Sequence, residues 1–377
     1  MGRRAAFRSW MLWIADPEPR FDPSLPLPAV LIRELLDHSA RHGVLPAAMR
    51  NLSRVVHLGS SSANRNDPAW QNTAQHDLAA VQERLHKMIG LSELLRATTK
   101  EIEASFHARS IEMLVVKGST FADRLYPDPA LRPFTDIDLL VPDRAIADAR
   151  KALADAGLSP AEEPVKKYAG GYSEEKWQHP RLGRSPVELH WNLVNSPKVR
   201  RVISLRYGDI VGHCVDGQFS PSALLVIAAV HGAAGHGFER LQTLIDVAQA
   251  ARGAAGLIDI NEALLLAERT GARLCLETAL LTCAVVLRDV TCMDLVQSVG
   301  PSHAAKVLAR LLGAGVIVES QGPYHHRHSW RRQLYREALV RLSQSPSYPS
   351  EAEGEKRRSE GSQLRSDTHT QRPDTLN

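Results

Sequence analysis

Two short runs in the middle of the chain have residue types and spacing suited to phosphate and metal chemistry. The first is Lys117, Gly118 and Ser119, which follow an apolar, β-branched run at 113–116 that predicts a buried strand ending in a turn. Because glycine has no Cβ, the backbone at Gly118 can come close to a phosphate. The N–H groups that open the next helix, expected at about 120–125, would point at that anion. The turn therefore predicts a phosphate site, to which Ser119 adds a hydroxyl.

The second run supplies carboxylates. Asp136 and Asp138 lie two positions apart in an expected strand over about 135–141, so both side chains project from the same face. Two converging carboxylates repel each other unless a cation lies between them, and hard oxygen ligands that leave sites open suit Mg²⁺. Glu188, in an expected strand at 187–191, supplies a third carboxylate. The pattern favours a Mg²⁺ or Mn²⁺ site that handles a triphosphate, which indicates nucleotidyl transfer.

These residues and their surroundings resemble a known family. The Gly118-Ser119 turn, Asp136-x-Asp138 and Glu188 are similar to the motif of polymerase-β-type nucleotidyltransferases: a Gly-Ser turn, a strand with paired acids and a later acidic strand. Over about residues 30 to 250, the chain is similar to the bacterial group of uncharacterised nucleotidyltransferases. The segments that carry this similarity are VVKGSTFADRLYPDPALRPFTDIDLLV, VELHWNL and HGAAGHGFERLQTLIDVA.

The resemblance implies a reaction and a role for each acid. Asp136 and Asp138 would bind the metal that carries the nucleoside triphosphate, and Glu188 would help a second metal to activate the acceptor hydroxyl. The reaction would move an NMP group from an NTP to that hydroxyl and release pyrophosphate. Small molecules or sugars are the favoured acceptors, and the sequence does not identify the base.

Four further residues extend the candidate site. Lys117 adjoins the glycine turn and is a candidate for triphosphate binding, although simpler members of the superfamily have an apolar residue there. Arg132 lies four residues before the acid pair, and a guanidinium donates bidentate hydrogen bonds to phosphate. His231 and Arg240 fall in the third similar segment and are weaker candidates for the acceptor pocket.

Each candidate residue also has an interpretation without function. The acid pair could lie on a solvated strand edge, Glu188 on the exposed face of an antiparallel strand, and Arg132 in an exposed loop. A histidine on an apolar helix is most often a core residue. Three functional alternatives stay open: the same transfer to tRNA or protein by a toxin-like enzyme, a module that binds nucleotide without turnover, and a glycosyltransferase. The last would use Asp-x-Asp but leave the glycine turn and Glu188 unexplained.

Length, composition and charge limit the classes of protein to which the chain can belong. The chain has 377 residues, 44% of them hydrophobic, which is enough for one large or two modest domains with a real core. No apolar stretch reaches the length of a membrane span and the N-terminus lacks a cleavage site, so we expect a cytoplasmic protein without a membrane partner. The net charge of +4 neither requires RNA as a partner nor rules it out. Four cysteines without paired spacing predict buried fillers instead of a zinc site or a disulfide framework.

The expected fold class is α+β: a small mixed sheet forms the nucleotidyltransferase core, with an N-terminal helical region and a C-terminal helical bundle. Five prolines between 17 and 28 predict a flexible opening beyond a short helix. Helical periodicity predicts helices at 31–42, at 45–56, at 72–110 as one long helix, and at 144–156. The His-rich tract 324–330 is expected to be solvated or to contact anions. The expected domain limits are 1–28 flexible, 29–110 helical, 111–215 core, 216–342 helical and 343–377 disordered.

Overall fold

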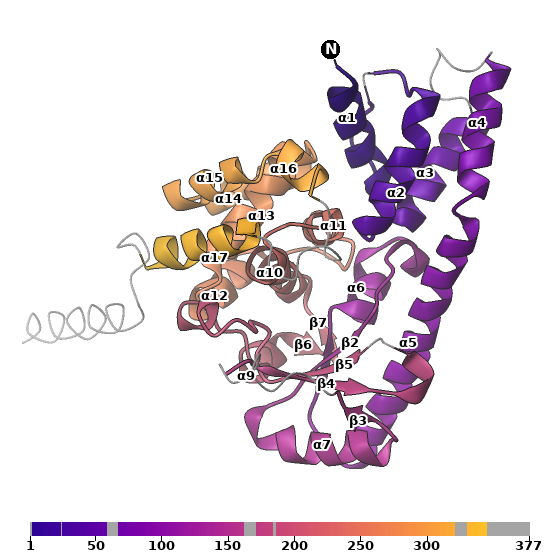
Figure 1. The fold of residues 1–377 in the computed structure, drawn as a ribbon. Helices are drawn as coiled ribbons and strands as arrows, with labels where there is room; N and C mark the ends of the chain where they lie inside the picture. The colour runs from indigo at the N-terminus through magenta and orange to yellow at the C-terminus, as the bar shows by residue number, and fades with distance from the viewer. Residues whose placement is uncertain are drawn as a thin grey trace, which may run out of the picture.

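The computed structural model describes residues 2–23, 25–58, 67–161, 171–183, 186–320 and 330–344. It confirms the α+β class. Helices precede and follow a small mixed sheet in the sequence, and helices also lie on both sides of this sheet in space (Figure 1). The predictions for the tract 324–329 and for the tail 345–377 concern residues outside these ranges. The domain limits remain predictions.

The N-terminal region contains five helices: α1 (Arg3–Ala15), α2 (Ala29–Arg41), α3 (Leu45–Leu58), α4 (Pro68–Ala79) and α5 (Gln82–Ala108). The short opening helix expected from the sequence is α1, and Trp10, Met11 and Ile14 give it an apolar face that is buried in the main core. The proline-rich segment behind it is held as well, since Trp10 Nε1 donates to the carbonyl of Leu25 at 2.9 Å.

The prediction of one long helix over 72–110 is wrong, because the helical structure is interrupted between α4 and α5. Val81 lies at the break and is only 3% exposed. It packs with the core of the N-terminal helices. The break between the two helices therefore coincides with a buried apolar residue. Beyond it, α5 runs from the N-terminal helices down to the sheet (Figure 1).

The sheet has five strands in the order β1-β2-β5-β4-β3. Their bounds are β1 (Leu114–Val116), β2 (Ile137–Leu140), β3 (Ser159–Pro160), β4 (Glu174–Gln178) and β5 (Pro186–His190). Only β2 and β5 pair in parallel. Successive side chains alternate between the two faces. One face is apolar and packs on α5 and α7 (Ile146–Asp155) through a second core cluster, and the other face is polar. Residues of the apolar face are Ile137, Leu139, Val187, Leu189 and Trp177.

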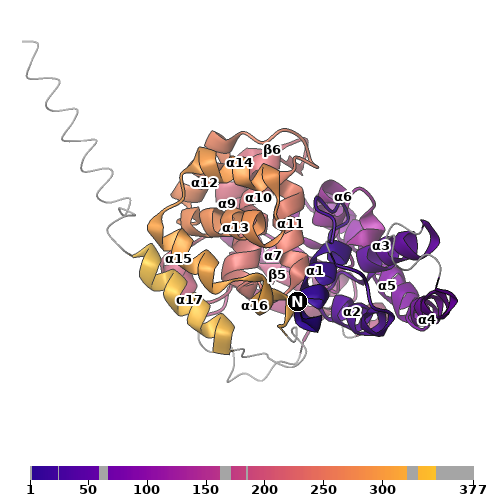
Figure 2. The same cartoon turned by 90° about the horizontal axis from the view of Figure 1, so that it is seen from above.

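The C-terminal helices pack around three almost wholly buried ones. These are α10 (Pro221–Val230), α11 (Leu241–Ala251) and α13 (Arg273–Val286). Seen from above, α11 lies between the N-terminal helices and the outer C-terminal ones (Figure 2). The outer helices are α12 (Ile260–Arg269), α14 (Val290–Val299), α15 (His303–Leu311), α16 (Ala314–Val318) and α17 (Trp330–Ser343). Smaller elements are α6 (Gly118–Leu125), η1 (Pro129–Leu131), η2 (Asp143–Ala145), η3 (Pro180–Leu182), η4 (Val199–Arg201), α9 (Tyr207–Ile210), η5 (Val211–His213), β6 (Cys214–Val215), β7 (Gln218–Phe219) and the π-helix η6 (His231–His236).

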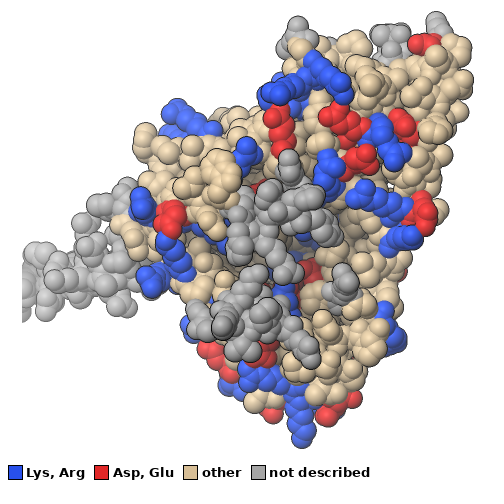
Figure 3. Space-filling view, viewed as in Figure 1, with Lys and Arg blue, Asp and Glu red and all other residues tan. Residues whose placement is uncertain are grey.

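The surface carries charged side chains of both signs (Figure 3), and the cysteines are free. On the face in Figure 3, basic and acidic side chains lie next to one another. Exposed ion pairs, such as Arg3 with Glu34, join some of the charged side chains of the protein. None of the described helices combines the length and the apolar character needed to cross a bilayer. All four cysteines are free thiols; three are buried and Cys214 is half-buried.

His42 links the N-terminal helices to the C-terminal ones. It follows α2, is fully buried, accepts a hydrogen bond at Nδ1 from the N–H of Leu241 at 3.2 Å, and contacts the carbonyl of Val318 through Nε2 at 3.1 Å. The N–H donor at Nδ1 requires the neutral ring with its proton on Nε2. Burial lowers the pKa of His42 to about 4. A charged His42 is therefore incompatible with this junction.

We expect His42 to make the fold acid-sensitive. Between its ordinary pKa of 6.5 and its folded pKa of about 4, the unfolded chain binds a proton that the folded chain refuses. Stability from this residue is therefore present above pH 6.5 and is lost as the pH falls toward 4, by about 3 kcal/mol. Urea unfolding at several pH values checks this. His42→Gln keeps one donor and one acceptor and should flatten the acid slope, whereas the exposed His57→Gln should leave it unchanged. An unaltered slope in His42→Gln would contradict the assignment.

Candidate functional site

The turn between β1 and α6 begins the site. Lys117 has φ +60° and ψ −133°, and Gly118 follows with φ +29°. Val116, the last residue of β1, lies opposite Asp138 in the antiparallel pair with β2, so the turn adjoins the start of β2. A Cβ built on Gly118 would lie 3.5 Å from the carbonyl oxygen of Asp136, which places the turn against the backbone of the first acid. Ser119 is buried at the start of α6.

The acids gather on the polar face of the sheet. Asp138 and Glu188 lie directly opposite each other in the parallel register of β2 and β5, so their side chains are on the same side. His190, two residues after Glu188, shares that side; its Nε2 lies 3.0 Å from Asp138 Oδ1 and 3.4 Å from Glu188 Oε2. Ligand atoms of these three residues all lie within 4.8 Å of one another. Asp136 precedes β2 by one residue and has the same parity as Asp138.

Basic groups surround these carboxylates. The ammonium of Lys117 forms an ion pair with Asp138, and Lys176 Nζ lies 2.8 Å from Glu188 Oε1. On its other side, His190 Nδ1 faces Glu174 Oε2 at 3.7 Å. Lys176 and Glu174 come from β4, directly opposite Glu188 and His190 in the antiparallel register. The polar face is therefore a network of alternating charges on three adjacent strands.

The charge states follow from burial and contact. Burial alone would lower the pKa of His190, but its hydrogen bonds to Asp138 and Glu188 raise it to about 9. Burial alone would raise the pKa of Glu188, but the hydrogen bond and charge of His190, with Lys176, hold it well below its usual range. Burial and repulsion by Asp138 and Glu188 raise the pKa of Asp136 to about 7. The His190 ring therefore bridges Asp138 and Glu188, and the crowding of the three acids is expressed in the raised pKa of Asp136.

Arg132 supports the glycine turn through hydrogen bonds. Its Nε and Nη2 each donate to one oxygen of Asp246 at 2.8 Å, and its Nη1 donates to the carbonyl of Gly118 at 3.1 Å. Tyr126 adds a hydrogen bond to Asp246 at 2.8 Å, and Arg132 is only 4% exposed. All three guanidinium nitrogens thus contact protein atoms. The structure gives Arg132 the place of a support for the glycine turn, and the direct phosphate contact expected of it stays a prediction.

His231 and Arg240 lie on the helical side of the site. The charge of Lys117, together with those of Arg132 and Arg240, acts on His231, and Arg240 acts on Asp136. His231 stacks edge-on against His236, with ring centroids 4.6 Å apart, at the two ends of η6. Burial, followed by these nearby cations, holds the pKa of His231 well below its ordinary value. π-helical turns are rare and are often found at functional sites. The roles of His231 and Arg240 in an acceptor pocket remain predictions.

The donor set fits a hard divalent cation. Asp136, Asp138 and Glu188 supply carboxylate oxygens on one side of the sheet, as Mg²⁺ and Mn²⁺ prefer. His190 belongs to the same cluster, but as an imidazolium it has no lone pair to give a metal. Its role in this arrangement is to hold Asp138 and Glu188 together.

Sequence reasoning missed His190, Lys176 and Glu174. A signal existed for the first, because His190 follows Glu188 at the same spacing of two that selected Asp136 and Asp138. Lys176 and Glu174 alternate in the same way within β4. Only the order of the strands, which places β4 beside β5, shows that they meet the acids.

A turn at the end of one strand, an Asp-x-Asp strand beside it and a parallel strand with a third acid together fit a metal-dependent nucleotidyltransferase. A family model described as "Uncharacterised nucleotidyltransferase" matches residues 28–288, and the chain belongs to this family. Neither the curated proteins nor the solved structures include a significant match to the chain.

Proposed function

We propose that this protein transfers an NMP group from an NTP to an acceptor hydroxyl, with Mg²⁺ or Mn²⁺ as cofactor. The observation that carries the proposal is the in-register pairing of Asp138 and Glu188 on parallel strands, beside the turn at Lys117. Family membership supports the same class of reaction. We favour a small molecule or a sugar as the acceptor.

Asp136, Asp138 and Glu188 would hold the cation. A divalent ion there supplies positive charge for the triphosphate and lowers the pKa of the acceptor hydroxyl. The N–H groups that open α6 and the hydroxyl of Ser119 would bind phosphate oxygens. The acceptor oxygen forms a bond to the α-phosphorus, the bond to pyrophosphate breaks, and the hydroxyl proton leaves. No side chain has to act as a nucleophile.

The helical side would bind the acceptor. His231 is neutral because burial and nearby cations lower its pKa, so its ring can accept a hydrogen bond from a hydroxyl group. Arg240, whose charge acts on Asp136, would donate to an anionic or polar part of the substrates. His231 is the first residue of η6, directly after α10, and Arg240 directly precedes α11. These buried helices would keep bulk water from the reacting groups.

Pyrophosphate release tests the proposal. We expect release with at least one of ATP, CTP, GTP and UTP when Mg²⁺ or Mn²⁺ and a cell extract as acceptor pool are present. A chelator, or the double variant Asp136→Asn/Asp138→Asn, should remove it. Label from the NTP would then appear on a small molecule, on RNA or on protein, which decides among the acceptor classes. Metal-dependent NTP binding without release would assign a non-catalytic module, and no binding at all would reject the site.

A further inference from the structure

Lys117 has a backbone conformation that side chains rarely adopt. Its φ of +60° and ψ of −133° lie in a region that glycine tolerates and other residues occupy under strain. Its surroundings fix it there. The N–H of Phe121 donates to the carbonyl of Lys117 at 2.9 Å, and Arg132 holds the next carbonyl at 3.1 Å. The chain thus keeps a long cationic side chain where a glycine would fit without strain, which points to a use for that cation.

The ammonium of Lys117 is directed into the acid cluster. It pairs with Asp138 Oδ1, and the two side chains are 14% and 3% exposed. The same Oδ1 lies 3.0 Å from His190 Nε2. This oxygen of Asp138 therefore already has two nitrogen partners, the Lys117 ammonium and the His190 ring.

We propose that Lys117 is an internal counter-cation that a divalent metal must displace from Asp138. This rests on the proposed function in one respect, since it takes Asp138 as a metal ligand. The metal and the ammonium compete for one carboxylate oxygen, so the metal alone binds weakly. Once displaced, the ammonium is left beside the glycine turn, where a triphosphate oxygen can pair with it. Binding of the metal and binding of the triphosphate then strengthen each other, and without triphosphate the site has a low affinity for divalent ions.

Titration of the full chain with Mn²⁺ alone, followed by calorimetry or by the electron spin resonance of free Mn²⁺, tests this without any turnover. Lys117→Met removes the charge and keeps much of the length of the side chain, and we expect it to bind Mn²⁺ at least about tenfold more tightly than the wild type. Lys117→Gly should do the same. It also relieves the backbone, so misfolding would not explain a failure, and a melting curve confirms that each variant is folded.

Lys176→Met is the matched control. It removes a cation from the same cluster, but one that contacts Glu188 from a regular strand at 2.8 Å. We expect its gain in Mn²⁺ affinity to stay below about threefold, as for a general change in local charge. Equal affinities in wild type and both Lys117 variants, or equal gains in Lys117→Met and Lys176→Met, would overturn the proposal.

The proposed function fails in a different way. Asp136→Asn/Asp138→Asn should abolish Mn²⁺ binding in the Lys117→Met background. If that background binds Mn²⁺ with the acids removed, or if no variant binds it, the metal site itself is wrongly placed. If the acids are needed but Lys117 has no effect, only the counter-cation role is rejected.

Discussion

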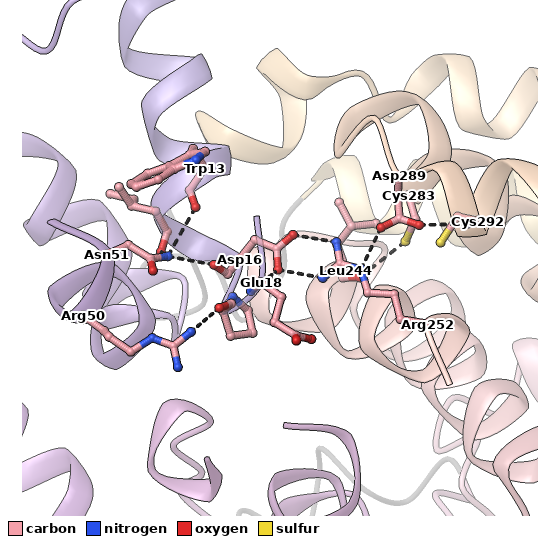
Figure 4. Close-up of polar contacts among 12 residues, drawn as sticks. Trp13, Asp16, Glu18, Arg50, Asn51, Leu244, Arg252, Cys283, Asp289 and Cys292 are labelled. Atoms are coloured by element: carbon pink, nitrogen blue, oxygen red, sulfur yellow. Dashed lines mark hydrogen bonds and ion pairs between the residues drawn. The ribbon is translucent and has the colours of Figure 1, made fainter. Parts of the chain in front are cut away.

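Replacing Arg252 with alanine should lower the free energy of unfolding by about 3–5 kcal/mol. Arg252 directly follows α11 and lies between two carboxylates (Figure 4). Its Nη1 and Nη2 donate to the two oxygens of Asp16 at 2.8 and 2.6 Å, and its Nε donates to Asp289 at 2.7 Å. All three side chains are 3% exposed or less. Alanine would leave two buried carboxylates without a cation, and neither could reach water without local unfolding.

The three partners lie far apart in the sequence, which makes the effect global. Asp16 follows α1 and also receives, at its carbonyl, a hydrogen bond of 2.7 Å from Asn51 in α3. Asp289 caps α14 by accepting from the N–H of Cys292 at 2.8 Å. Loss of Arg252 therefore loosens the N-terminal helices from the C-terminal ones and also disturbs a helix cap.

Urea unfolding followed by tryptophan fluorescence measures the loss. Arg3→Ala is the matched control, because its ion pair with Glu34 has the same chemistry at side-chain exposures of 66% and 40%. Exposed pairs contribute about 0–1 kcal/mol, so this variant should unfold almost as the wild type does. If Arg252→Ala is no less stable than Arg3→Ala, the buried network does not hold the two regions together.

The sequence predicted the parts of the site that depend on local pattern. Alternation in single strands identified Asp136, Asp138 and Glu188, and the glycine turn located Lys117, because strand period and turn chemistry are properties of neighbouring residues. It could not predict what Arg132 does. Its partner, Asp246, is 114 residues away, and only packing of α11 against the turn brings them together. An arginine can bind an exposed phosphate or a buried carboxylate, and the sequence around Arg132 does not distinguish these two uses.

The contacts of the N-terminal segment also lie beyond what local pattern can predict. Prolines after residue 16 correctly exclude regular structure in that segment, but they say nothing of whether it is held by contacts elsewhere. Trp10 binds the Leu25 carbonyl, and Asp16 binds Arg252, 236 residues on. An irregular segment can thus be fixed as firmly as a helix when distant partners meet its polar groups.

The largest catalytic effect should come from Asp138→Asn. Asp138 is 3% exposed, contacts both Lys117 and His190, and lies opposite Glu188. Asparagine keeps the shape of the side chain and removes the charge. Because a bound metal contributes several kcal/mol of transition-state stabilisation, we expect kcat to fall on the order of 10³-fold. KM for the NTP should change far less, since the lost interaction strengthens in the transition state.

Steady-state kinetics of pyrophosphate release, with the acceptor identified, separates kcat from KM. The control is Asp143→Asn in η2, an exposed carboxylate five residues further along that pairs loosely with Arg206 at 3.4 Å. It should stay within about twofold of wild type, since exposed pairs contribute little. Asp138→Asn with kcat within tenfold of wild type would mean that the transferring centre does not use this acid. A rise in KM at unchanged kcat would instead make Asp138 a residue that binds substrate and transition state equally, which its position between Lys117 and His190 argues against.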